Sequence, residues 1–263
     1  MSEREIAVSG TFYPDSKEEV LKYIDYFNNN FSLKNEINLT PRAIIVPHAG
    51  YVYSGFTANL AYNIASKHKY KRIVVIGPSH KVYIDGASIA LYDEYPTPLG
   101  NIEIDKEYSL KLKEKYEFLN FFNNAHKEHS TETQAPFVKN YFEDTKMIEI
   151  VYGKINFEVL SIVIEELLED KDNLVVISTD LSHFHTKEEA NILDAVCIEA
   201  IVKKDMQMFE KGCEACGIVG VKAITNLAVK NNFKTKMLYY CTSYDVTKDD
   251  KSVVGYTSIL IGE

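Results

Sequence analysis

Strand and helix signals alternate along most of this chain, and the alternation limits its possible folds more than any other feature of the sequence. The strand signals are runs rich in Val and Ile, most of them apolar almost throughout, as expected for strands covered on both faces. They lie at Ala43–Val46, Arg72–Ile76, Ala87–Leu91, Met147–Val151, Leu174–Ile177 and Ser252–Ile261. The pattern predicts an α/β fold with a largely parallel central sheet flanked by helices.

Helical segments between these runs carry apolar residues three and four positions apart. They are the segment Phe56–Ile64 with Ser54 as its cap, Phe157–Leu168, Glu188–Val202 and Ile218–Val229. The segment Ser130–Phe142 also has a cap signal, but Pro136 should bend or interrupt it. Nothing in the sequence has the composition of a linker, so residues 1–263 are expected to form a single domain.

The overall charge limits the classes of partner. The formal net charge is −9 and the sequence pI is about 5.4. Such a field repels phosphate backbones and anionic membrane faces, so neither nucleic acid nor a membrane is an expected partner.

The first residues lack the apolar core of a signal peptide, which favours a cytoplasmic protein. The four cysteines are expected to be reduced, because they are too few and too unevenly spaced for a disulfide scaffold.

Two of the strand signals end in a histidine. His48 follows the first run in the sequence PHAG, and His80 follows the second in GPSH. Pro and Gly beside each histidine favour rigid turns. Because the carboxyl ends of parallel strands share one edge of a sheet, the two imidazoles are expected to meet there, from neighbouring strands. A single strand-end histidine is more often a hydrogen-bonded loop residue, but two in matching context indicate a site for Fe, Cu, Zn or Ni.

A second group of polar residues follows the run Leu174–Ile177. Asp180 and His183 would reach the same sheet edge, where a histidine oriented by a carboxylate can transfer protons. The alternative is that Asp180 simply caps the next helix. His129 is a further candidate that could face the crevice, although its surroundings also suit the start of a helix.

The third metal ligand has two candidates near the C-terminus, Cys241 and Asp245. Asp245 would complete a set of two histidines and one carboxylate, which suits non-heme iron, whereas Cys241 would favour softer metals such as zinc or Cu(I). The spacing of Cys213 and Cys216 matches CxxC, but it precedes a helix and has no second pair. It therefore indicates packed small residues rather than a metal or redox site.

Several short motifs, taken in order, resemble the Memo family over nearly the whole chain. They are SGTFYP from Ser9, PHAGYVYSG from Pro47, GPSH from Gly77, TPLG from Thr97, EHS from Glu128, STDLSH from Ser178 and SVVGY from Ser252. The resemblance implies a fold similar to class III extradiol dioxygenases. It also implies that His48 and His80 are metal ligands and that His183 is an acid/base histidine. The animal family member has a cysteine as third ligand, and here Asp245 and Cys241 both remain candidates.

The resemblance implies two classes of function. Animal members are described as iron- or copper-binding redox proteins and as binders of phosphotyrosine peptides, and prokaryotic relatives are named with a radical-SAM partner protein. The first hypothesis is therefore a metal-dependent, dioxygenase-like oxidoreductase with a small-molecule substrate, using iron or copper, with zinc possible. The second is a binding module that uses the same crevice for a peptide or partner protein.

Overall fold

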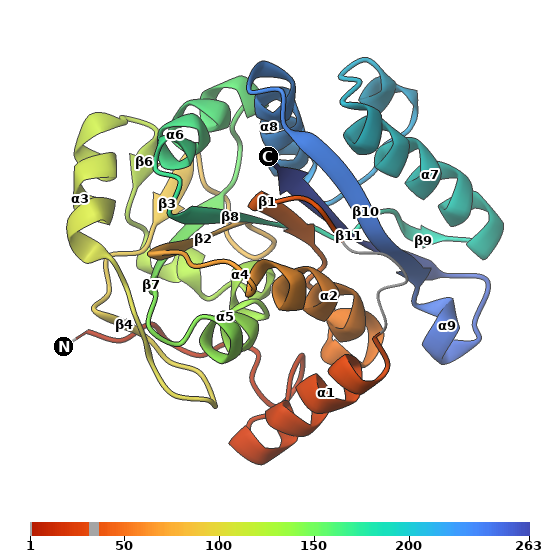
Figure 1. Cartoon of the computed structure of the whole chain (residues 1–263), viewed down its shortest axis with the longest axis horizontal. Helices are drawn as coiled ribbons and strands as arrows, with labels where there is room; N and C mark the ends of the chain where they lie inside the picture. Colours follow the sequence, from red (N-terminus) through yellow and green to blue (C-terminus); the bar gives the residue numbers. More distant parts are fainter. Residues whose placement is uncertain (1, 32–36) are drawn as a thin grey trace.

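In the computed structural model, which describes residues 2–31 and 37–263, a mixed sheet runs through the middle of the molecule (Figure 1). Its strand order is β10-β11-β1-β8-β2-β7-β3-β6, and β9 pairs with β11. The strands are β1 (Pro41–Val46), β2 (Arg72–Pro78), β3 (Ala87–Ile89), β6 (Leu119–Asn120), β7 (Lys146–Tyr152), β8 (Asn173–Ser178), β9 (His183–His185), β10 (Lys234–Thr242) and β11 (Val253–Gly262). A separate ladder joins β4 (Glu94–Tyr95) to β5 (Ile102–Glu103).

The centre of the sheet is parallel, which confirms the expected fold class. Strands β1, β8, β2 and β7 run in one direction. On one side of this centre β11 is antiparallel to both β1 and β10, and on the other side β3 is antiparallel to β7. Every residue of β1 and β8 is buried, which explains why the sequence of each is apolar at consecutive positions rather than alternately.

Helices cover both faces of the sheet (Figure 1). Helices α6 (Phe157–Glu169), α7 (Lys187–Lys203) and α8 (Ile218–Lys230) lie on one face, and α1 (Lys17–Asn29), α2 (Phe56–Ala65) and α5 (Ala135–Tyr141) lie on the other. Each layer has its own apolar cluster. Along β8, for example, Val175 belongs to one cluster and Val176 to the other. Burying one Val or Ile side chain completely contributes about 1.5 to 3 kcal/mol to the free energy of folding, so the apolar clusters of both layers are needed for stability.

Most sequence expectations for these elements are confirmed, with small changes at their ends. The segment containing Pro136 is interrupted as expected: α4 (His129–Glu132) ends before α5 begins, and Pro136 lies in the first turn of α5. The remaining helices are α3 (Lys106–Lys115) and α9 (Tyr244–Thr247), and short helical turns lie at η1 (Tyr51–Gly55), η2 (Asn123–His126) and η3 (Met208–Lys211).

Two local expectations were wrong. Ser54 does not cap α2, because the chain is already π-helical in η1, and the Ser54 hydroxyl instead donates to the Ala49 carbonyl at 3.1 Å. The cysteines are not all reduced, since Cys197 on α7 and Cys213 after η3 form a disulfide. The packing of η3 against α7 brings these two residues together, and sequence spacing does not reveal that contact. Among the helices of the described residues, none is both long and apolar enough to cross a membrane.

Candidate metal centre

The carboxyl edge of the parallel strands carries several of the residues that the sequence analysis singled out. His48 follows β1 and His80 follows β2. The two strands are not neighbours as expected, because β8 lies between them and pairs with both. The intervening strand contributes Ser178 at its end and Asp180 just beyond it, so Asp180, one of the two predicted acid/base residues, approaches His48 from the middle of the edge.

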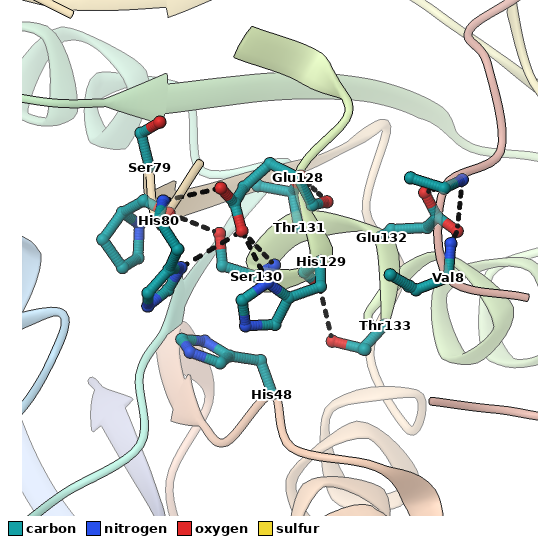
Figure 2. A network of polar contacts seen from close by, with 12 residues as sticks. Val8, His48, Ser79, His80, Glu128, His129, Ser130, Thr131, Glu132 and Thr133 are labelled. Carbon is teal, nitrogen blue, oxygen red and sulfur yellow. Dashed lines mark hydrogen bonds and ion pairs between the residues drawn. The ribbon is translucent and has the colours of Figure 1, made fainter. Parts of the chain in front are cut away.

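Three imidazoles meet at this edge, those of His48, His80 and His129 (Figure 2). One ligand nitrogen from each lies within 4.8 Å of the others. The ring centroids of His80 and His129 are 4.5 Å apart, and each lies 5.2 Å from the centroid of His48. The expected meeting of His48 with His80 is therefore confirmed, and His129 from α4 completes the group.

The Glu128 carboxylate orients two of these rings. Its Oε1 atom lies 3.1 Å from Nδ1 of His80 and 2.8 Å from Nδ1 of His129 (Figure 2). Its Oε2 accepts the backbone N–H of His80 at 2.6 Å. Burial alone would raise the pKa of Glu128, but the hydrogen bonds from His129 and His80 outweigh it and hold the pKa well below its usual range. Because an ionised carboxylate only accepts hydrogen bonds, both Nδ1 atoms donate, which leaves both Nε2 atoms for a ligand.

The third ring, that of His48, is also held through its Nδ1 atom, in this case by Ser178. The single hydroxyl proton of Ser178 is donated to the carbonyl oxygen of Ser130. The hydroxyl therefore accepts from Nδ1 of His48, which lies 3.0 Å away. Burial, together with the neighbouring His129 and His80, lowers the pKa of His48 to about 4 and outweighs the opposing effect of Asp180. His48 is therefore neutral at pH 7, and its Nε2 atom is left as an acceptor.

Cys216 is a site residue that the sequence analysis missed. It lies two residues before α8, and its Sγ atom is 3.3 Å from Nε2 of His48. Its backbone N–H donates to the carbonyl of Asp180, and its sulfur accepts the backbone N–H of Asp180 at 3.2 Å. Burial, reinforced by Asp180, raises the thiol pKa to about 12, so the thiol donates its proton to His48 in the absence of a cation. Cys213 of the same CxxC spacing is held in the disulfide, which leaves Cys216 reduced.

Asp180 lies at the centre, and His183 lies farther out. Oδ1 of Asp180 accepts the backbone N–H of His48 at 2.8 Å, so Asp180 does not cap a helix. Helix α7 is instead capped by Thr186. Oδ2 of Asp180 is 3.9 Å from Nε2 of His48, and no donor within residues 2–31 and 37–263 forms a hydrogen bond to it. The ring of His183 lies on β9 against Phe184, 5.7 Å between centroids, outside the group of three rings.

Comparison with known proteins identifies the family. Residues 4–260 match the family described as Memo-like protein. The chain belongs to the Memo family. It is 36% identical over 271 residues to a MEMO1 family protein of Aquifex aeolicus, covering 99% of each chain. A MEMO1 family protein of Methanobrevibacter smithii is 33% identical over 278 residues, covering 97% of this chain and 98% of the relative. A third, from Thermoplasma volcanium, is 31% identical over 265 residues, covering 98% and 97%.

In this Memo family chain, the two residues expected as third ligand lie elsewhere. The Cys241 sulfur contacts the Thr57 hydroxyl at 3.2 Å, and Asp245 accepts the backbone N–H of Thr242 at 2.9 Å. Neither belongs to the group of ligand atoms formed by the three histidines. The reason is the strand order: β10, which carries Cys241, is separated from β1 by β11. His129 is the third member of the group, and Cys216 is the cysteine that contacts His48 in this Memo family chain.

Close packing of α4 on β2 fixes the position of His129 and leads to a first prediction. A Cβ atom on Gly77 would lie 2.6 Å from Oγ of Ser130, the residue after His129. We expect Gly77→Ala to lower the free energy of unfolding by about 1 to 3 kcal/mol through overpacking. Urea denaturation followed by circular dichroism measures this. Gly50→Ala is the control, because the nearest atom to its Cβ would be 3.5 Å away, and an equal loss in both variants would contradict the prediction.

Proposed function

We propose that this Memo family chain is a metal-dependent oxidoreductase that binds one redox-capable transition metal ion through Nε2 of His48, His80 and His129. The proposal rests on one observation: each Nδ1 atom is held by a protein partner, which leaves the three Nε2 atoms for a ligand in a group where one ligand nitrogen of each ring lies within 4.8 Å of the others. Imidazole nitrogen is a common ligand for iron, copper and zinc. Iron or copper is the proposed occupant, and zinc is the alternative.

The charges around the site support a cation. Glu128 is 1% exposed, and among the described side chains its carboxylate forms hydrogen bonds and ion pairs only with His80 and His129. Asp180 places a second buried carboxylate beside His48. Buried carboxylates are costly unless a positive charge compensates them. A cation at the three Nε2 atoms would supply that charge.

The residues around the site are arranged to handle protons. A bound iron or copper ion would supply one-electron chemistry and Lewis acidity. Coordination by Cys216 as a thiolate would release the proton that its sulfur now shares with His48, so binding would become tighter as pH rises. Oδ2 of Asp180, which lies 3.9 Å from Nε2 of His48, is the proposed acceptor for a proton from a small-molecule substrate. An acid/base role for His183 remains a prediction, as does a radical-SAM partner protein.

Metal titration of chain purified without a metal-binding tag tests the proposal. Fe(II) under anaerobic conditions, then copper and zinc, are titrated, and bound metal is counted after gel filtration. We expect one ion per chain, and at least about 100-fold weaker binding by His80→Ala, because losing a ligand costs more than losing a group that orients one. His185→Ala is the matched control. The two histidine side chains are 32% and 33% exposed, and each pairs with a glutamate.

The outcomes separate the two classes of function. Tight binding lost only in His80→Ala supports the metal site, and oxygen consumption by the iron- or copper-loaded chain supports oxidoreductase chemistry. If no metal binds, or if His80→Ala binds as tightly as the unaltered chain, the proposal is wrong. A metal-free protein that binds a peptide or partner would instead favour the binding module.

A further inference from the structure

The N-terminal segment Arg4–Tyr13, here called the N-terminal clamp, contacts the turn that carries His129. The Glu132 carboxylate at the end of α4 accepts the backbone N–H of Val8 at 2.8 Å and that of Ala7 at 2.9 Å (Figure 2). It also accepts the hydroxyl of Tyr13 at 3.0 Å. Glu132 is completely buried. These bonds tie the middle and the C-terminal end of the clamp to one side chain, three residues after His129.

Arg4 contacts the other side of the same turn. Its guanidinium donates to Glu132 Oε2 at 2.5 Å and to the carbonyl oxygen of Glu128 at 3.0 Å. A third bond reaches Glu149 on β7 at 3.2 Å. The Glu128 carbonyl that Arg4 binds belongs to the peptide bond joining Glu128 to His129. The planar donors of one buried arginine therefore fix the peptide from which both the ligand and the carboxylate that orients it project.

Phe12 brings the clamp onto the imidazole itself. Its ring centroid is 4.9 Å from that of His129, at an interplanar angle of 45°. Its backbone is held on both sides, with the N–H donating to the carbonyl of Val8 at 2.9 Å and the carbonyl accepting the N–H of Tyr51 at 2.7 Å. The ring is partly exposed. Phe12 therefore forms an apolar wall that limits rotation of the His129 ring.

We propose that the N-terminal clamp is a component of the metal centre, in which Arg4 and Phe12 act as positioning residues for His129. This inference rests on the proposed metal binding. Glu128 holds Nδ1 of His129, Arg4 holds the peptide, and Phe12 packs against the ring, so the direction of Nε2 is fixed at three points. Substituting either Arg4 or Phe12 leaves all three histidine ligands present but changes the direction of Nε2 of His129.

The first test compares two partly exposed phenylalanines that each pack on a histidine. Phe12→Leu removes the wall beside His129, whereas Phe121→Leu removes a ring 5.7 Å from His126, which lies outside the metal group. Co(II) is the probe, because its visible absorption bands report coordination geometry. We expect Phe12→Leu to weaken Co(II) binding about 10-fold and to shift the bands, as for other groups that orient ligands. Phe121→Leu should change neither.

The second test compares two buried arginines, each in an ion pair with a glutamate and each packed on an aromatic ring. Lysine keeps the charge of Arg4 but cannot hold three acceptors in one plane. We expect Arg4→Lys to weaken Co(II) binding about 10-fold and shift the bands, and Arg42→Lys to leave both unchanged. Denaturation curves and circular dichroism confirm that each variant is folded.

These results separate the two proposals. If the unaltered chain binds Co(II) and His80→Ala does not, the metal site stands. Unchanged affinity and bands in Phe12→Leu and in folded Arg4→Lys would then overturn the clamp alone. An equal effect in the Phe121 and Arg42 controls would also overturn it, because the change would reflect general loosening. If the unaltered chain binds no Co(II), the proposed function fails, and the clamp fails with it.

Discussion

Replacing Arg4 by Met is expected to lower the free energy of unfolding by about 3 to 5 kcal/mol at pH 7, because it breaks a buried ion pair by removing one partner. Glu132 and Glu149 are both completely buried, and Arg4 is the cation that bonds both. Without it, two carboxylates lose their compensating charge in a region that water cannot reach. Burial by itself lowers the pKa of Arg4, but Glu149, Tyr95 and Glu132 outweigh it and raise the pKa.

Arg42→Met is the matched control for stability. Arg42 is also buried, but the side chain of its partner Glu263 is 47% exposed and stays hydrated when the arginine is lost. The expected loss is about 1 kcal/mol, as for other solvent-exposed pairs. Urea denaturation followed by circular dichroism measures both variants. A similar loss in the two would show that the Arg4 network is not compensating buried charge, and the prediction would be wrong.

Acid should destabilise the protein through the same network. Burial would raise the pKa of Glu149, but Arg4 and His126 outweigh it and lower the pKa from 4.5 to about 2. Between these values the folded state binds fewer protons than the unfolded chain, so stability falls as pH falls. The contribution of Glu149 is fully present above about pH 5 and lost near pH 2. Its size is on the order of 3 kcal/mol, since the side chain is completely buried.

Glu149→Gln tests this assignment, because glutamine keeps the size of the side chain but cannot be protonated in this range. We expect the variant to be less stable at pH 7 but to lose less stability than the unaltered chain between pH 5 and pH 3. The exposed Glu143→Gln should keep the full pH dependence. Urea denaturation midpoints at pH 7, 5 and 3 provide the measurement. If the denaturation midpoint falls equally with pH in Glu149→Gln and in the unaltered chain, the acid sensitivity belongs to other groups.

The architecture was accessible from the sequence because it depends on local patterns. Apolar runs such as Ala43–Val46 indicate strands covered on both faces, and the observed β1 and β8 are buried along their whole length. The interruption before Pro136 follows from the missing backbone donor of proline. Ser54 misled the prediction because a serine near a helix start can cap it, whereas here the preceding turn is already helical.

The candidate site was only partly accessible. His48, His80 and Asp180 could be placed, because residues that follow parallel strands share one sheet edge. His129 was recognised as a candidate facing the crevice, but not as the third ring of the group. Cys216 was overlooked because its CxxC spacing has no second pair and precedes a helix, which indicated packed small residues, whereas in the structure Cys213 bonds to Cys197 and Cys216 lies beside His48. The EHS motif from Glu128 in the family resemblance was the available signal for the carboxylate.

By itself the sequence determined that the chain is an α/β domain of the Memo family and that two histidines reach the carboxyl edge of the sheet. The reason is that patterns within short segments indicate burial and strand direction. Only the tertiary structure decided which groups surround those histidines. Arg4 and Glu132 are 128 residues apart along the chain, and Cys216 and His48 are 168 apart. Contacts at such separations depend on strand order and on how helices pack on the sheet, and no local pattern encodes them.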